Sequence, residues 1–302
     1  MLVLISMVYK NSEYLFFQED LCRKLSKYDY YRIIVDCSEN SEERQRLESL
    51  PNTTIIDGAW INKYRLSEAV GVAANFMVQI AERIGTKYAV ILDVDVVPLV
   101  PNWDALVLKS LDSGVDAMGI PYNPLHGSRR IMNMPSTFFF AFNTRRIVKA
   151  KLDWRPRLPS WVRNRMYWFY RKLNTYIFTN EPKKFFDFEL SQFALLKMKQ
   201  KGMKVVSMNI KQPWDSDSKL KFNISHLPND KSTVDPLMHD YPEEWHFEGV
   251  LFATHQRRGR GVRNPGPVRS YMRSFNQTEY SKDWVKVIKD YLNKEYKIKI
   301  DY

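Results

Sequence analysis

Short apolar runs alternate with amphipathic stretches along the N-terminal part of this 302-residue chain. Four of these runs fit buried strands: LVLISMV, YYRIIVD, NTTIID and YAVIL. Stretches with helical spacing separate them, most clearly LSEAVGVAANFMVQIAERIG, where Gly85 is placed to end the helix. Strands that alternate with helices predict an α/β fold with a mainly parallel, doubly wound central sheet.

The pattern changes after Ala150, where an insertion rich in Arg, Trp, Tyr and Phe covers residues 151–186. From Lys211 to Glu248 the chain is rich in Asp, Asn, Pro and Lys, and this composition predicts a loop. The remaining segments predict a helix, two strands and a closing amphipathic helix: FELSQFALLKMKQKG, MKVVSMNI, GVLFATH and SKDWVKVIKDYLNKEY.

The composition narrows the class of protein. Hydrophobic residues make up 44% of the chain, which is typical of a globular domain. Cys22 and Cys37 give neither a disulfide framework nor a zinc spacing, which fits a reducing compartment. No run of about 18 apolar residues is present, so we expect no membrane span, and MLVLISMV fits a first strand better than a signal peptide. The formal charge of +12 predicts attraction to polyanions, but the scattered basic residues and the lack of an RNA-binding motif argue against nucleic acid.

Two carboxylates, Asp93 and Asp95, follow the apolar run YAVIL. Spaced by one residue at a strand end, they can both reach one hard cation, and Mg²⁺ and Mn²⁺ prefer such oxygen ligands and commonly bridge to phosphates. Asp36 also ends a predicted strand, and ligands bind at this edge of doubly wound sheets. The alternative is that the two acids are solvated and simply open a loop.

The segment VILDVDVV resembles the haloacid-dehalogenase phosphatases, in which the first Asp, Asp93 in this chain, is the nucleophile. That family also needs a Ser or Thr, a Lys and an acidic pair after another strand. Its motif lies near the start of the chain, whereas three predicted strands precede Asp93. The acidic candidate for the pair is DSDSK, at Asp215, within the predicted loop.

A second resemblance covers residues 1 to about 202. LISMVYKNSE, with Val8, Tyr9 and Asn11, resembles the first strand and nucleotide-contacting turn of nucleotide-sugar glycosyltransferases of the GT-A fold, and is similar to glycosyltransferase family 2. IIVDCSENSE resembles the second strand of that family, and this implies that Asp36 binds the base of the nucleotide.

Two further stretches follow in the family's order. AANFMVQIAERIGTKYAVILDVD resembles the run that leads to the family's metal-binding DxD, with Asn75, Asp93 and Asp95 in corresponding places, although Ala74 stands where the family has Arg. STFFFAFNTRRI resembles the strand on the donor-sugar and acceptor side. The resemblance implies a Rossmann-like GT-A domain over residues 1–210 and an extension over residues 211–302 that closes the site.

The activity implied is transfer of a sugar from a nucleoside diphosphate sugar to a hydroxyl of a glycan or lipid-linked acceptor, dependent on Mn²⁺ or Mg²⁺, with inversion favoured over retention. FFDFELSQFALLKMKQKGMKVV resembles the helix whose leading acidic residue is the catalytic base. One of Asp187 and Glu189 is expected to cap that helix and the other to act as base, with Asp187 favoured.

His255 ends the predicted strand GVLFATH, and it resembles the histidine that many metal-dependent GT-A enzymes use as an extra metal ligand. A histidine satisfied by hydrogen bonds in the core is the alternative. Arg257 and Arg258 begin a basic, glycine-containing loop that could close over a diphosphate, because guanidinium pairs bidentately with phosphate oxygens. A merely solvated basic loop is the alternative there.

Residues 154–178 combine many aromatic side chains with arginines, a mixture that favours the headgroup layer of an anionic membrane. We therefore expect peripheral attachment to the cytoplasmic face of a membrane. The alternative is that these aromatics, Trp154 among them, pack on the domain's own core. A different class of function, a non-catalytic protein that binds membrane or polyanions, stays open at this point.

The acidic pair gives a first prediction. If the reaction inverts, Asp187→Asn or Glu189→Gln should lower turnover by about 10²-fold or more and leave donor affinity nearly unchanged, because only deprotonation of the acceptor is lost. Steady-state kinetics measure both quantities. A product with retained anomeric configuration by NMR would rule the assignment out.

Overall fold

The computed structural model describes residues 2–9, 12–64, 66–121, 134–155, 192–231, 234, 241–257 and 279–300. The strands in these ranges are β1 (Leu2–Val8), β2 (Tyr30–Asp36), β3 (Thr53–Asp57), β4 (Tyr88–Leu92), β5 (Val96–Pro98), β6 (Ala117–Gly119), β7 (Phe139–Asn143), β8 (Val205–Ser207), β9 (Asn209–Lys211), β10 (Tyr241–Phe247) and β11 (Val250–Arg257). The helices are α1 (Ser12–Leu25), α2 (Ser41–Glu48), the 3₁₀ helix η1 (Ala59–Lys63), α3 (Leu66–Arg83), α4 (Trp103–Asp112), α5 (Thr144–Ala150), α7 (Gln192–Gln200) and α8 (Glu279–Tyr296).

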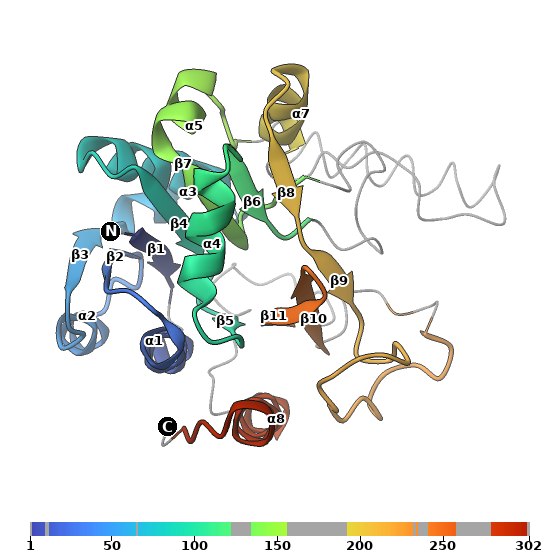
Figure 1. The fold of residues 1–302 in the computed structure, drawn as a ribbon. Helices are drawn as coiled ribbons and strands as arrows, with labels where there is room; N and C mark the ends of the chain where they lie inside the picture. Colours follow the sequence, from blue (N-terminus) through green and yellow to red (C-terminus); the bar gives the residue numbers. More distant parts are fainter. Residues whose placement is uncertain are drawn as a thin grey trace, which may run out of the picture.

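In the described residues, the central sheet has seven strands in the order β3-β2-β1-β4-β7-β6-β8 (Figure 1). The first four strands of that order are parallel to one another, β7 runs antiparallel to both of its neighbours, and β8 is parallel to β6. The predicted α/β class with a mainly parallel sheet is therefore confirmed. The carboxyl ends of β1, β2 and β4 lie along one edge.

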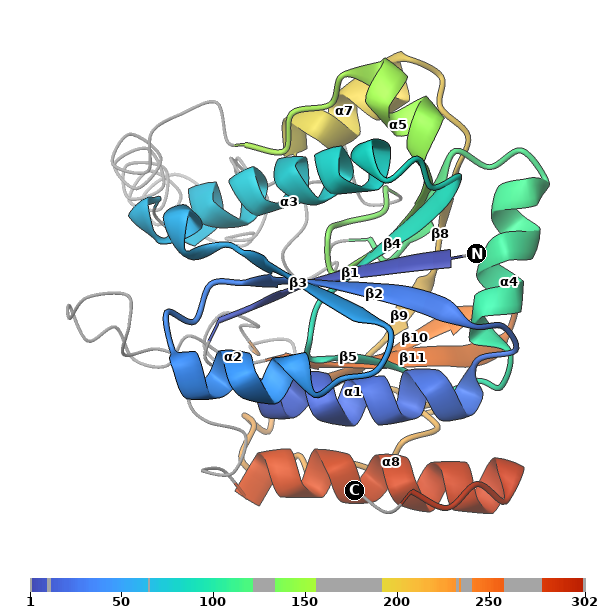
Figure 2. The ribbon, with the colours of Figure 1, turned by 90° about the vertical axis from the view of Figure 1, so that its left-hand side faces the viewer.

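Helices cover both faces of this sheet. Figure 2 shows α3, α5 and α7 on one face, α1 and α2 on the other, and α8 outside α1. Alternate residues of β1 enter different cores: Leu2 and Leu4 pack on the α1 side, whereas Val3 and Ile5 pack on the α3 side. Burial on both faces explains why β1 and β4 are almost continuous apolar runs.

A second, smaller sheet has the order β5-β11-β10-β9 among the described residues. It joins the strand that follows Asp95 to strands near the C-terminal end, because β5 pairs antiparallel with β11. The segment MKVVSMNI, predicted as one strand, is divided between the two sheets: β8 belongs to the large sheet and β9 to the small one.

The strand β10 corrects the predicted loop between Lys211 and Glu248. Its glutamates are typical of a loop in composition, yet Glu243 and Glu244 are each only 1% exposed. Glu244 is satisfied there because it accepts hydrogen bonds from Ser218 Oγ at 2.6 Å and from the Leu220 N–H, and pairs with His246. Burial alone would raise the pKa of Glu244, but these donors outweigh it and hold the pKa below its ordinary value.

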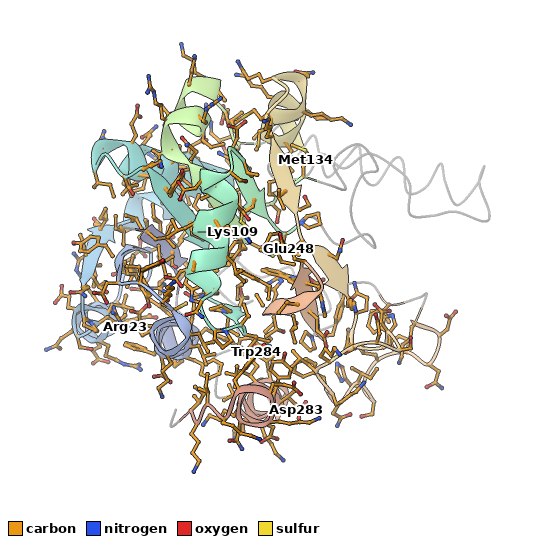
Figure 3. All side chains as sticks on the ribbon, viewed as in Figure 1. Arg23, Lys109, Met134, Glu248, Asp283 and Trp284 are labelled. Carbon is orange, nitrogen blue, oxygen red and sulfur yellow. The ribbon has the colours of Figure 1, made fainter. Side chains whose placement is uncertain are left out.

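The closing helix α8 packs against α1 through one aromatic residue. Trp284 is fully buried, and its ring lies 6.1 Å from that of Tyr14 and 5.7 Å from that of Phe17. Figure 3 labels Trp284 on the side of α8 that faces the rest of the molecule. None of the helices in the described ranges is both long and apolar enough to cross a membrane.

Candidate functional site

The Asp93–Asp95 segment is a tight turn at the carboxyl end of β4. The turn is closed by a hydrogen bond from the Val96 N–H to the Asp93 carbonyl at 3.1 Å, and the Asp93 N–H donates to the Phe138 carbonyl at 2.9 Å. Asp93 is half-buried, and Asp95 is 8% exposed. Both carboxylates therefore leave the sheet at the edge where strand alternation predicted a site.

His255 lies beside Asp95 because of the register of the small sheet. Val96 is paired with His255 across β5 and β11, and the Gln256 N–H donates to the Asp95 carbonyl at 3.0 Å. His255 Nε2 is 3.6 Å from Asp95 Oδ1. Two residues predicted from separate segments are thus brought together.

Aromatic rings hold the His255 imidazole in place. Its ring centroid is 5.1 Å from that of Phe138 and 5.3 Å from that of Trp245, and the residue is 5% exposed. The imidazole is therefore packed against two aromatic rings in a buried position, which restricts its rotamers and keeps Nε2 near Asp95.

Glu243 was missed by the sequence reasoning. It is the cross-strand partner of His255 on β10, and its Oε2 lies 3.7 Å from His255 Nδ1 and accepts a hydrogen bond from Trp245 Nε1 at 3.3 Å. A metal-bound histidine commonly has a carboxylate behind its other nitrogen, which fixes the ring orientation. The alternation of Tyr241, Glu243 and Trp245 was the signal that could have identified this strand and its inward-facing acid.

The chemistry of these side chains fits a divalent cation in part. The 3.6 Å separation of Asp95 and His255 is too long for a hydrogen bond, and His255 Nδ1 has no hydrogen-bond partner among the described residues. Two ligands held about 2.1 Å from one cation at right angles lie roughly 3 Å apart, which needs only a small adjustment of this pair. In the described ranges no group of three or more His, Cys, Asp or Glu side chains forms a complete metal site. An incomplete protein ligand set is typical of cations that also bind substrate phosphates.

Asp36 lies at the same edge of the sheet. Val8 and Asp36 are paired at the ends of β1 and β2, and β1 is also the neighbour of β4. Asp36 Oδ1 accepts hydrogen bonds from the Ser38 N–H at 2.9 Å and from Ser38 Oγ at 2.6 Å. Val8 is 0% exposed, and its carbonyl accepts a hydrogen bond from the Cys37 N–H at 2.8 Å, while the adjacent Tyr9 is half-buried.

Asn75 lies elsewhere and already has partners. Its amide nitrogen donates to Asp153 Oδ1 at 2.8 Å, and its amide oxygen accepts from the Trp154 N–H at 3.1 Å. Asn75, Asp153 and Trp154 all border a cavity of about 470 Å³ between η1, α3 and α5. The described residues that line this cavity do not include the carboxylates and histidine at the sheet edge.

The other predicted site residues are not placed. Asn11, Asp187, Glu189 and Arg258 lie outside the described residues, as does the side chain of Arg257, and the assignments made to them stay predictions.

Trp154 corrects one part of the membrane hypothesis. It is 1% exposed and packs edge-on against Phe140, with ring centroids 4.9 Å apart. The expectation that Trp154 faces lipid is therefore wrong, because its ring fills the core on the α3 side. The rest of the aromatic segment, residues 156–178, lies outside the described residues.

The acids of DSDSK, considered for a phosphatase, make their contacts locally. Asp215 accepts a hydrogen bond from the Gln212 N–H at 2.8 Å, and Asp217 pairs with Lys211 at 2.5 Å. These contacts hold the loop after β9 together.

Comparisons with models of protein families and with curated proteins gave no match. Comparison with solved structures did give matches. The mannosyltransferase PcManGT from Pyrobaculum calidifontis, solved with GDP-Man and Mn²⁺, is 14% identical with a TM-score of 0.38, over 68% of this chain and 54% of that one. TarS 1-349 from S. aureus is 13% identical with a TM-score of 0.36, over 53% of this chain and 51% of that one.

Mouse xyloside xylosyltransferase 1 is 12% identical with a TM-score of 0.40, over 69% of this chain and 86% of that one. This chain spans about half the length of the first two structures. Since all three TM-scores lie below 0.5, the function of this chain is inferred from its own residues.

The geometry predicts a metal response. Mn²⁺ should raise the melting temperature of the wild type, because a ligand that binds the folded state stabilises it, and Asp93→Ala, Asp95→Ala and His255→Ala should each lose most of that rise. Without metal the two Asp variants should stay folded, since the mutual repulsion of the acids is removed. Calorimetry with Mn²⁺ or a chelator measures both effects, with Asp217→Ala as a control carboxylate. An undiminished rise in Asp95→Ala would contradict the metal assignment.

Proposed function

We propose that this chain is a metal-dependent glycosyltransferase that moves a sugar from a nucleoside diphosphate sugar to an acceptor hydroxyl. The observation that carries the proposal is the register of β5 and β11, which sets His255 beside Asp95 at the edge where Asp36 also ends its strand. A carboxylate pair, an imidazole and a further strand-end acid at one edge of a mainly parallel sheet suit a nucleotide and its phosphates.

Each group has a task in this proposal. Asp93, Asp95 and His255 hold a Mn²⁺ or Mg²⁺ ion, which when bound neutralises the charge of the departing diphosphate. Asp36 and the turn that begins at Val8 and Tyr9 hold the nucleoside, because they end the neighbouring strands. The buried setting of Asp95 and His255 strengthens these charge interactions by excluding water.

The roles proposed for the catalytic base and for the basic loop rest on the sequence alone. Asp187 or Glu189 removes the proton of the attacking hydroxyl, so that the sugar is transferred with inversion, and Arg257 and Arg258 pair with the diphosphate. The extension over residues 211–302 contributes His255 and closes the site. The acceptor is a glycan or a lipid-linked molecule.

A donor screen tests the proposal. Purified protein with Mn²⁺ should release nucleoside diphosphate from one of a panel of nucleotide sugars, and chelator or Asp95→Ala should abolish the release. The panel includes GDP-Man, which is present in the PcManGT structure, and UDP-GlcNAc, which is present in a further structure of TarS 1-349. Release from no donor, together with hydrolysis of p-nitrophenyl phosphate that depends on Asp93, would instead support the phosphatase alternative.

The proposal extends to the place of action, which is peripheral attachment to the cytoplasmic face of an anionic membrane. The supporting feature is the mixture of aromatic and basic residues in the sequence beyond Arg155. Wild-type protein should float with anionic liposomes, and the triple variant Trp161→Ser, Trp168→Ser, Phe169→Ser should float less, because the aromatic contacts are lost. Wild type that stays at the bottom, or a variant that floats equally, would overturn this location.

A further inference from the structure

One side chain on α1 makes hydrogen bonds to both ends of the Asp93–Val96 turn. Gln18 is fully buried, and its amide nitrogen donates to the Asp93 carbonyl and to the Val96 carbonyl, both at 2.6 Å. These two carbonyls flank the residue that carries the more buried acid, Asp95. Gln18 therefore binds both ends of the turn through backbone carbonyls and not through the carboxylates of Asp93 and Asp95.

The orientation of this amide is set by a buried guanidinium. Arg32, in the middle of β2, is fully buried, and its Nη1 donates to Gln18 Oε1 at 2.9 Å. Since the guanidinium can only donate, the Gln18 oxygen must face it, and the amide nitrogen must face the turn. The same Nη1 donates to Ser6 Oγ at 3.0 Å, and Ser6 Oγ donates to the Leu92 carbonyl at 2.8 Å.

A buried carboxylate balances the charge of Arg32. Glu19, next to Gln18 on α1 and 3% exposed, forms an ion pair with Arg32 Nε and a second ion pair with Arg23 at 2.5 Å. Burial alone would lower the pKa of Arg32, but Glu19 and the neighbouring Cys22 and Tyr30 together outweigh it and raise the pKa, so the guanidinium stays charged. The network thus links α1, β1, β2 and the end of β4.

We propose that Gln18, oriented by Arg32, is a positioning residue for the cation site: it holds the backbone of the turn so that the Asp95 carboxylate faces His255 before the cation binds. This inference rests on the proposed function, since it concerns the same metal site. Neither residue touches the substrate or the cation. Loss of such an orienting partner commonly weakens metal binding by about 10- to 100-fold.

The test compares Mn²⁺ affinity with stability. Gln18→Met keeps the length of the side chain but cannot donate to the two carbonyls, so the dissociation constant for Mn²⁺, measured by electron paramagnetic resonance, should rise about tenfold or more. At saturating Mn²⁺ the turnover should return close to the wild-type level, because the chemistry itself is untouched.

Asp104→Ala is the matched control. Asp104 is 1% exposed and accepts the Lys27 and Tyr28 N–H groups, each at 2.8 Å, beyond the other end of α1. This variant should lower the melting temperature but leave the Mn²⁺ affinity unchanged, which separates positioning from a general loss of stability.

A second variant covers the case in which Gln18→Met does not fold. The double variant Arg32→Met, Glu19→Leu removes both buried charges together, and it should also weaken Mn²⁺ binding. Arg23 loses Glu19 in this variant, but its side chain is 30% exposed and still donates to the Pro51 carbonyl, so no buried charge is left unpaired. A wild-type affinity in whichever variant folds overturns the positioning role. Wild-type protein that binds no Mn²⁺ overturns the metal site of the proposed function, and the inference with it.

Discussion

A charged side chain in the middle of a buried parallel strand is the constraint on which the rest of this structure depends. Arg32 occupies β2 with no exposure, where leaving a charge without its partner costs about 3–5 kcal/mol. Glu19 supplies that partner, which fixes how α1 lies on the sheet, and Gln18 follows on the same helix. One ion pair and its hydrogen bonds therefore tie α1 to the sheet and to the turn after β4.

The small sheet brings His255 to the turn after β4. Without β5 the chain after Asp95 would have no fixed relation to the residues near 255, but the antiparallel pairing places Val96 opposite His255. The site is thus built from a turn held from below by α1 and a histidine held from the side by β11. Its acids and imidazole come from segments far apart in the sequence, and backbone pairing brings them together.

The sequence predicted those parts of the fold and site that depend on local pattern. The strands β1, β2 and β4 are mostly apolar, so their ends, and with them Asp36, Asp93 and Asp95, could be located. The strand β10 was missed, because its glutamates are typical of a loop and are buried only through partners that lie elsewhere in the chain, such as Ser218 for Glu244. In the sequence, Gln18 and Arg32 cannot be distinguished from ordinary helix and strand residues. Only the tertiary contact between them gives them the proposed role in positioning the turn.

The most direct measurement of the central claim is anomalous X-ray diffraction from crystals grown with Mn²⁺ and a nucleoside diphosphate. The account predicts one Mn²⁺ ion bound by the Asp95 carboxylate and the His255 imidazole, with the diphosphate as a further ligand and the nucleoside beside Asp36. A Mn²⁺ ion bound away from Asp95 and His255, or a nucleotide bound at a different edge of the sheet, would contradict it.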